Sequence, residues 1–184
     1  LTAKKLAKKF KKQEDVKITV IDKNSYHTML TELHEVAANR VEEDSIRVSL
    51  KRVFAGRNVN LVLDTITAID YDKQVLTGKQ AEYAYDYLVM ASGSKPAFYG
   101  IPGAEEHTFR LWSYENAVRL KAHISNMFIK ATIEPDEATK RRLLTFFIAG
   151  AGFTGVEMAG ELAEWVPSLC HEFEVDREMV RIIE

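Results

Sequence analysis

The sequence has very little cysteine and proline, with one cysteine and four prolines among 184 residues. A single cysteine, Cys170, cannot close an internal disulfide, and it has no Cys-x-x-Cys partner for redox or zinc chemistry. No apolar run approaches the roughly 18 residues that cross a bilayer, and the basic amino terminus lacks the apolar region of a signal peptide. These absences predict a chain that is soluble as given and comes from a reducing compartment.

The sequence also has no large excess of either charge: it contains 25 Lys and Arg and 27 Asp and Glu, which gives a net charge of −2. This balance does not favour a protein that coats nucleic acid. The lysines at the amino terminus are interpreted as the solvated face of a helix. No histidine pair has metal-ligand spacing, so we expect no metal site and assign the histidines to surface or packing roles: His27, His34, His107, His123 and His171.

The hydrophobic content of 46% is enough for a folded core. Helical patterns cover residues 3–12, 26–40, 45–54 and 113–130, and also 156–165 with a stop at Pro167. Strand patterns cover residues 16–21, 58–69, 74–77, 87–91, 143–148 and 180–184. The continuous apolar run 87–91 is typical of a central parallel strand buried on both faces. Residues 96–102 have the composition of a linker.

The amino terminus begins inside a helical pattern. Leu1 is already apolar, and no capping residue precedes the spacing that runs from Ala3. We therefore expect the chain to be a piece of a longer protein.

The strongest local motif is Gly150-x-Gly152-x-x-Gly155, which lies between an apolar strand and an amphipathic helix. In a dinucleotide-binding loop the first glycine permits a tight turn, the second lets the backbone approach a pyrophosphate, and the third allows close packing. The N–H groups at the helix start then hold the phosphate charge. The alternative is an ordinary βα turn without a ligand.

Such a loop is usually followed by an acid that binds the adenosine ribose. Asp176 and Glu184 are both candidates, and Glu184 is favoured because it ends an apolar strand; an acid there favours NAD(H) over NADP(H). Glu157 and Glu161 stand at i, i+4, where like charges are mildly destabilising unless something offsets them. Either one of these two acids faces the nicotinamide or a second substrate and handles a proton there, or both merely suit the helix amino terminus.

The first half reads as a second βαβ unit without its first strand and glycine loop. Helix 3–12 is followed by strand 16–21 and then by Asp22. Asp22 is either a second ribose-binding acid or an exposed loop residue.

Taken together, these segments resemble the pyridine nucleotide-disulfide oxidoreductase superfamily, and within it the type II NADH dehydrogenases. The resemblance lies in residues 20–27, 33–38, 85–94, 150–157 and 160–162. It implies an α/β, Rossmann-like flavoprotein fold with two dinucleotide-binding domains, truncated at both ends and carrying a β-meander. The implied domains are a partial FAD domain over 1–103, a linker helix region over 104–142 and the start of an NAD domain over 143–184.

The resemblance also implies the chemistry. NADH passes hydride to FAD, and the flavin passes electrons to a quinone, with Glu157 near the nicotinamide and quinone. The residues implied at FAD are Asp22, Lys23, Thr31, Asp64, Thr65, Ala91, Ser92 and Gly93. The residues expected at NADH are Gly150, Gly152, Phe153, Thr154, Gly155 and Glu184. The lone cysteine makes disulfide reduction an unsuitable activity.

Several expectations concern the parent protein. It is expected in the cytoplasm, on the cytoplasmic face of a membrane through a region outside this chain. The fragment alone is expected to be inactive and to self-associate through open strand edges. The alternatives are a flavin- and NADH-binding redox sensor or interaction protein, a reductase with a non-quinone acceptor, and a folded piece without ligand.

Overall fold

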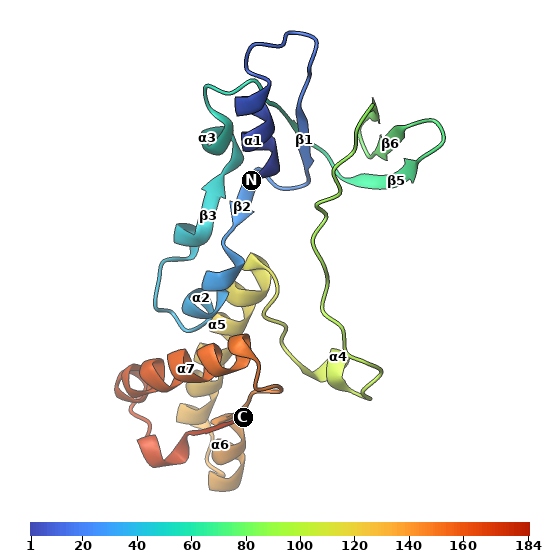
Figure 1. The fold of residues 1–184 in the computed structure, drawn as a ribbon. Coiled ribbons are helices and arrows are strands. Elements are labelled where there is room, and N and C mark those ends of the chain that lie inside the picture. Colours follow the sequence, from blue (N-terminus) through green and yellow to red (C-terminus); the bar gives the residue numbers. More distant parts are fainter. The chain divides into compact units, whose positions relative to one another are not determined.

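The computed structural model describes all of residues 1–184, and the chain forms two compact units (Figure 1). Unit 1 comprises residues 1–27 and 47–94, and unit 2 comprises residues 28–46 and 95–184. Residues 28–46 therefore pack with the carboxyl-terminal half and not with their sequence neighbours. These units are defined by packing alone, so the functional domain boundaries at 103 and 142 stay a prediction.

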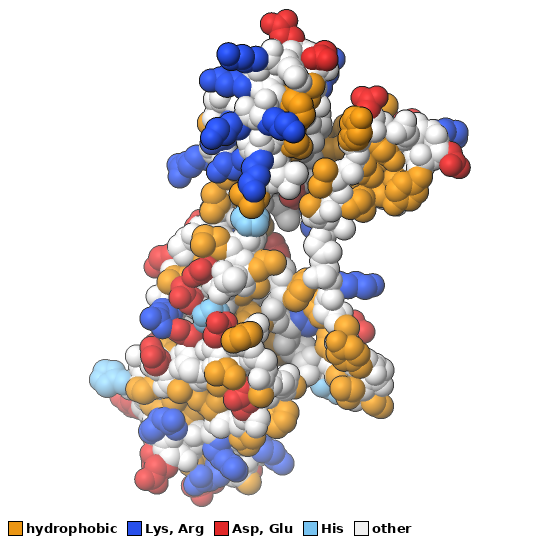
Figure 2. All heavy atoms as spheres, viewed as in Figure 1, with side chains coloured by type: hydrophobic (Ala, Val, Ile, Leu, Met, Phe, Trp, Pro, Cys, Tyr) orange, Lys and Arg blue, Asp and Glu red, His pale blue; other side chains and the backbone are white.

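Unit 1 contains the expected helix and parallel strand. Helix α1 (Thr2–Lys9) turns Ala7 inward and its lysines outward, and Figure 2 shows the basic side chains gathered over it. Strand β1 (Thr19–Asp22) pairs in parallel with β4 (Asn60–Leu63). Parallel pairing requires a crossover, and the chain between the two strands supplies it.

The β-meander is confirmed in unit 1. Strands β5 (Ile66–Asp70), β6 (Val75–Gly78) and β7 (Glu82–Ala84) form an antiparallel sheet in sequence order. The turn between β5 and β6 is held by the Lys73 amide, which donates to Asp70 Oδ1 at 2.9 Å. The sequence did not predict β7, which is only three residues long.

The helices expected over 26–40 and 45–54 are wrong over much of their length. Those ranges hold β2 (Tyr26–Thr28), the 3-10 turns η1 (Leu30–Glu32) and η2 (Glu43–Ile46), and β3 (Arg47–Ser49); only α2 (Leu33–Ala37) and α3 (Leu50–Phe54) are α-helical. Strands β2 and β3 pair with each other. Long-range strand pairing therefore overrides the local helical spacing.

The buried central strand expected over 87–91 is also wrong. This stretch has no regular secondary structure, and Tyr87 is 96% exposed while Val89 and Met90 are more than half exposed. A central strand needs a neighbour at each edge and a layer on each face. In unit 1 β1 and β4 pair only with each other, so the apolar run has no sheet to enter.

Unit 2 contains a βαβ unit, as the sequence predicted. Strand β8 (Thr145–Phe147) leads into helix α7 (Phe153–Glu172), and β9 (Arg181–Ile183) returns parallel to β8. The remaining elements are α4 (Ala104–His107), α5 (Tyr114–Ile133), α6 (Glu137–Leu143) and the 3-10 turn η3 (Arg177–Met179). The sequence did not predict α6, which Asp136 caps by accepting from the Thr139 amide at 2.7 Å.

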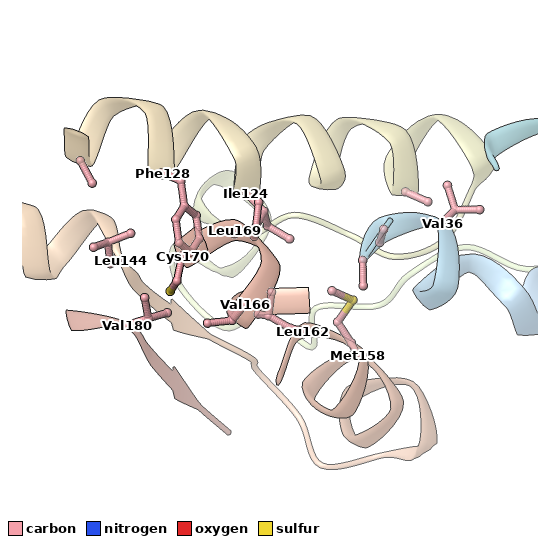
Figure 3. Close-up of a cluster of buried hydrophobic side chains, with 14 of the residues drawn as sticks. Val36, Ile124, Phe128, Leu144, Met158, Leu162, Val166, Leu169, Cys170 and Val180 are labelled. Carbon is pink, nitrogen blue, oxygen red and sulfur yellow. The ribbon is translucent and has the colours of Figure 1, made fainter. Parts of the chain in front are cut away.

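The core of unit 2 lies between α2, α5 and α7. Figure 3 shows Val36, Ile124 and Leu162, one from each helix, within one cluster of buried side chains. Phe128 is fully buried, with its ring centroid 6.1 Å from that of Phe146 on β8 and from that of Phe173 after α7. This core fixes α7, whose first turn carries the glycine motif.

Helix α7 does not stop at Pro167, contrary to the sequence prediction. It runs through this proline to Glu172. Val166 before the proline and Leu169 and Cys170 after it are all buried on the same face. Continuous burial of that face outweighs the cost of a proline inside the helix.

Candidate dinucleotide-binding site

The first and third glycines of the motif are required by the chain's own geometry. Gly150 has φ +118°, a backbone conformation that side chains rarely adopt. A Cβ on Gly155 would lie 1.9 Å from the carbonyl oxygen of Gly150. The loop after β8 therefore folds tightly against the first turn of α7, as the sequence motif predicted.

The second glycine is different. Gly152 has φ −79°, and a Cβ built on it would meet no atom within 4 Å. Nothing in the chain's own packing therefore requires glycine at this position. A glycine here leaves the backbone open to the close approach of a ligand, as the second glycine of a dinucleotide-binding loop does.

The amino terminus of α7 presents free donors beside Gly152. The first backbone bond of the helix runs from the Val156 amide to the Gly152 carbonyl at 3.0 Å, and no side chain caps this end. The amides of Phe153, Thr154 and Gly155 precede that bond, so they have no partner within the helix. Together with the positive end of the helix dipole, they form a suitable anion site.

Glu184 lies next to this loop. Its Oε1 atom is 3.4 Å from the position that a Cβ on Gly155 would take. The Ile148 amide donates to the Ile183 carbonyl at 2.7 Å, which holds the end of β9 beside the loop. Asp176 instead accepts from the Glu178 amide at 3.0 Å and caps η3. Of the two candidate acids, the structure brings only Glu184 to the glycine motif.

The acids of α7 have basic partners on the neighbouring segment of unit 2. Glu157 Oε2 lies 3.5 Å from His34 Nδ1 on α2. Arg40 donates to Glu161 and lies 3.7 Å from Glu164. The positive charge of Arg40 thus offsets the negative charge of Glu161, one of the two like charges at i, i+4. Sequence reasoning missed both pairings, because no local spacing connects residues more than 100 positions apart.

Possible ligand atoms of His34, Glu35 and Glu161 lie within 4.8 Å of one another. The Arg40 guanidinium already neutralises Glu161, and its hydrogen bond with that carboxylate raises the pKa of Arg40. We therefore assign this cluster to the ion-pair network between α2 and α7.

Unit 1 brings together three of the residues expected at FAD. Asp22 ends β1 and accepts from the Asn24 amide at 2.8 Å through its carboxylate. Its carbonyl accepts from the Asp64 amide at 3.0 Å, and the Thr65 amide donates to Asp64 Oδ1 at 2.6 Å. Lys23 is exposed beside them. Asp22, Asp64 and Thr65 therefore share the carboxyl end of the β1–β4 pair.

The Asp64 carboxylate is buried and fully engaged. It accepts from the amides of Lys79 at 3.1 Å and Gln80 at 3.2 Å, and from the Tyr83 hydroxyl at 2.8 Å. Burial opposes the charge, but the hydrogen bonds from Tyr83, Gln80 and Thr65 outweigh it and hold the pKa of Asp64 below its ordinary value. The side chain thus anchors the meander to β4, a role the sequence did not indicate.

The other residues expected at FAD are exposed. Thr31 lies in η1 of unit 2, where its hydroxyl donates to Glu32 at 3.3 Å. Ala91, Ser92 and Gly93 lie in the irregular segment of unit 1, and Gly93 has φ +74°. That these residues form one site with Asp22 stays a prediction.

A parallel strand–glycine loop–helix–strand unit with an acid ending its second strand defines a dinucleotide-binding α/β protein. Residues 2–182 match the pyridine nucleotide-disulphide oxidoreductase family. The chain belongs to that family, whose cofactors are FAD and NAD(H).

Comparison with curated proteins agrees. The chain is 35% identical over 171 residues to the type II NADH:quinone oxidoreductase of Staphylococcus aureus in several strains. The match covers 92% of this chain and 42% of that protein. The chain therefore spans less than half the length of the relatives it matches.

Two solved structures have the same fold as this chain over most of its length. The NDH2 of Plasmodium falciparum in complex with NADH matches with a TM-score of 0.84 and 18% identity, over 92% of this chain and 36% of that one. NADH:rubredoxin oxidoreductase from Clostridium acetobutylicum matches with a TM-score of 0.61 and 22% identity, over 90% of this chain and 46% of that one.

None of the helices in the structure has the length and apolar character needed to cross a membrane.

Proposed function

We propose that this chain is part of a FAD-dependent NADH dehydrogenase that passes electrons from NADH through flavin to a quinone. The observation that carries the proposal is the glycine loop, in which the chain's own packing requires Gly150 and Gly155 but not Gly152. Family membership and the similarity to type II NADH:quinone oxidoreductases support it.

In this proposal NADH binds at the amino terminus of α7. The amides of Phe153, Thr154 and Gly155 hold the pyrophosphate, and Gly152 lets it approach the backbone. Glu184 accepts hydrogen bonds from the adenosine ribose and repels the 2′-phosphate of NADPH. Because these groups come from one βαβ unit, they are positioned together by the same core.

FAD binding is assigned to the residues that the family resemblance implies. Asp22 and Lys23 bind near the adenosine, the backbone at Asp64 and Thr65 lies near the adenine, and Thr31 approaches the flavin. Ala91, Ser92 and Gly93 pass the pyrophosphate. Three of these residues share the end of the β1–β4 pair, which supports the adenosine end of the assignment.

Glu157 is proposed as the catalytic residue. It lies two residues after Gly155 on α7, and its side chain is 48% exposed, so it can face a bound nicotinamide. Bound flavin supplies the hydride-accepting chemistry, and the protein positions the reactants. In this proposal Glu157 places its carboxylate beside the nicotinamide and the flavin.

The test is a visible spectrum of the full-length parent protein, incubated with FAD and then given NADH without oxygen. We expect NADH to bleach the flavin band, and a quinone to restore it faster than oxygen does. Restoration by a non-quinone acceptor alone would favour another reductase, and bleaching without turnover would favour a redox sensor. Failure of NADH to bleach bound flavin would contradict the proposal.

We also propose that the parent enzyme works on the cytoplasmic face of a membrane through a region outside residues 1–184. The chain itself is proposed to self-associate, because the two-stranded sheets β1–β4 and β8–β9 each leave strand edges unpaired. Sedimentation across a concentration series should show dimers or larger species. A strictly monomeric chain would contradict self-association.

A further inference from the structure

The contact between His34 and Glu157 has no role in the function described so far. His34 Nδ1 lies 3.5 Å from Glu157 Oε2, and the His34 side chain is 13% exposed against 48% for Glu157. The imidazole is therefore the better buried partner, and the carboxylate is the one that reaches toward solvent. Both residues belong to unit 2, so the packing of α2 against α7 sets their separation.

The surrounding charges leave His34 as the basic partner of Glu157. Arg40 is directed to Glu161 and Glu164 further along α7. Lys121 on α5, the other helix packed on α2, pairs with Glu43. The remaining charged side chains on these helices include Glu35 on α2 and Glu115, Arg119 and Lys130 on α5.

Buried apolar side chains hold the two helices on which this pair stands. Val36 lies two residues after His34 on α2, and Met158 is next to Glu157 on α7; both are buried in the common core (Figure 3). Because the core holds α2 rigidly against α7, the His34 side chain can fix the orientation of the more exposed Glu157 carboxylate.

We propose that His34 is a positioning residue for Glu157. The Nδ1–H group donates to the Glu157 carboxylate and holds it in one orientation beside the nicotinamide end of the dinucleotide site. An ionised carboxylate only accepts hydrogen bonds, so an imidazole that pairs with it through Nδ1 must carry a proton on that nitrogen. The inference rests on the proposed function for what Glu157 faces, but not for the pairing itself.

The pairing is tested by two-bond ¹H–¹⁵N spectra of the chain without any cofactor, at a pH where the ring is neutral. These spectra report which ring nitrogen of His34 carries the proton. We expect the Nδ1–H form in the wild type and its loss in Glu157→Leu, while the spectrum of His171 stays unchanged. A His34 ring that carries its proton on Nε2 in both proteins would overturn the proposal.

The positioning role is tested in the full-length parent protein, by anaerobic reduction of its bound flavin by NADH. In His34→Leu we expect the rate to fall by about tenfold or more, with the Kd for NADH unchanged because the glycine loop is intact. His34→Asn, whose side-chain amide can place an N–H donor near the Nδ1 position, should recover part of the rate. His171→Gln, an exposed histidine on the same α7, is the matched control and should match the wild type.

The two tests separate the possible failures. Equal rates in His34→Leu and wild type would overturn the positioning role, as would a parallel loss of NADH affinity and rate. If NADH reduces flavin in none of the proteins, the proposed function fails, and the cofactor-free spectra still decide whether His34 donates to Glu157.

Discussion

At the residue scale, two glycines on the same helix behave oppositely. A Cβ on Gly155 would collide with the Gly150 carbonyl, whereas a Cβ on Gly160 would meet no atom within 4 Å. Both lie in α7, Gly155 in its first turn and Gly160 in its interior. The close contact with the Gly150 carbonyl is present only at Gly155.

We predict opposite effects on stability for alanine at these positions. Gly155→Ala should lower the free energy of unfolding by about 1–3 kcal/mol, because backbone must move to relieve the contact. Gly160→Ala should raise it by about 0.5–1 kcal/mol through the lower entropy of the unfolded chain. Urea unfolding followed by circular dichroism measures both. Equal effects of the two changes would contradict the loop geometry.

Asp64 predicts a pH-dependent contribution to stability. Its pKa in the folded chain lies below the ordinary value of 3.8, so its charged form stabilises the fold above that pH. The contribution is lost as the pH falls through the folded pKa. Asp64→Asn should therefore lower the urea midpoint at pH 7, and the difference from wild type should shrink toward pH 2.

The matched control for Asp64 is Asp72→Asn, an exposed acid in the turn of the same meander. It should leave the urea midpoint nearly unchanged across the pH range. If the urea midpoints of Asp64→Asn and wild type differ by the same amount at pH 2 and pH 7, the negative charge of Asp64 does not stabilise the fold.

The positions of residues that depend on local spacing could be predicted from the sequence. The glycine motif and Glu184 were predictable because one βαβ unit sets their positions. The pairing of His34 with Glu157 was not, since it depends on the packing of α2 against α7 across more than 100 residues. The side-chain role of Asp64 was missed because three of its four donors, Lys79, Gln80 and Tyr83, come from the meander that follows it.

At the element scale, long patterns succeeded and short ones failed. The helix expected over 113–130 is α5, because its apolar spacing is long and Ser113 caps it by accepting from the Asn116 amide at 3.2 Å. The stretch 26–54 failed because strands of three residues carry too little pattern to compete with helical spacing. The apolar run 87–91 failed because a strand is defined by its neighbours.

Phe128 tests the core that positions α7. It is fully buried against Phe146 and Phe173. Phe128→Ala should lower the stability of unit 2 by about 3–5 kcal/mol. Phe147→Ala, a residue that is 71% exposed on β8, should have little effect. Urea titration followed by amide resonances of each unit measures this, and equal loss in both variants would contradict the assigned core.

At the scale of the whole molecule, the chain is two packed units, and only unit 2 holds a complete strand–loop–helix–strand motif. The amino-terminal half supplies the β1–β4 pair and the meander, and it contributes α2 to the core of unit 2. The central claim, that the glycine loop binds NADH, therefore belongs to unit 2 and can be tested there without flavin.

The most direct test is chemical-shift mapping of the ¹⁵N-labelled chain during titration with NADH. The account predicts saturable shifts in the amides of residues 150–156 and at Glu184, weaker shifts with NADPH, and their loss in Gly152→Ala with the fold unchanged. Absence of saturable shifts, or shifts that persist unchanged in Gly152→Ala, would contradict it.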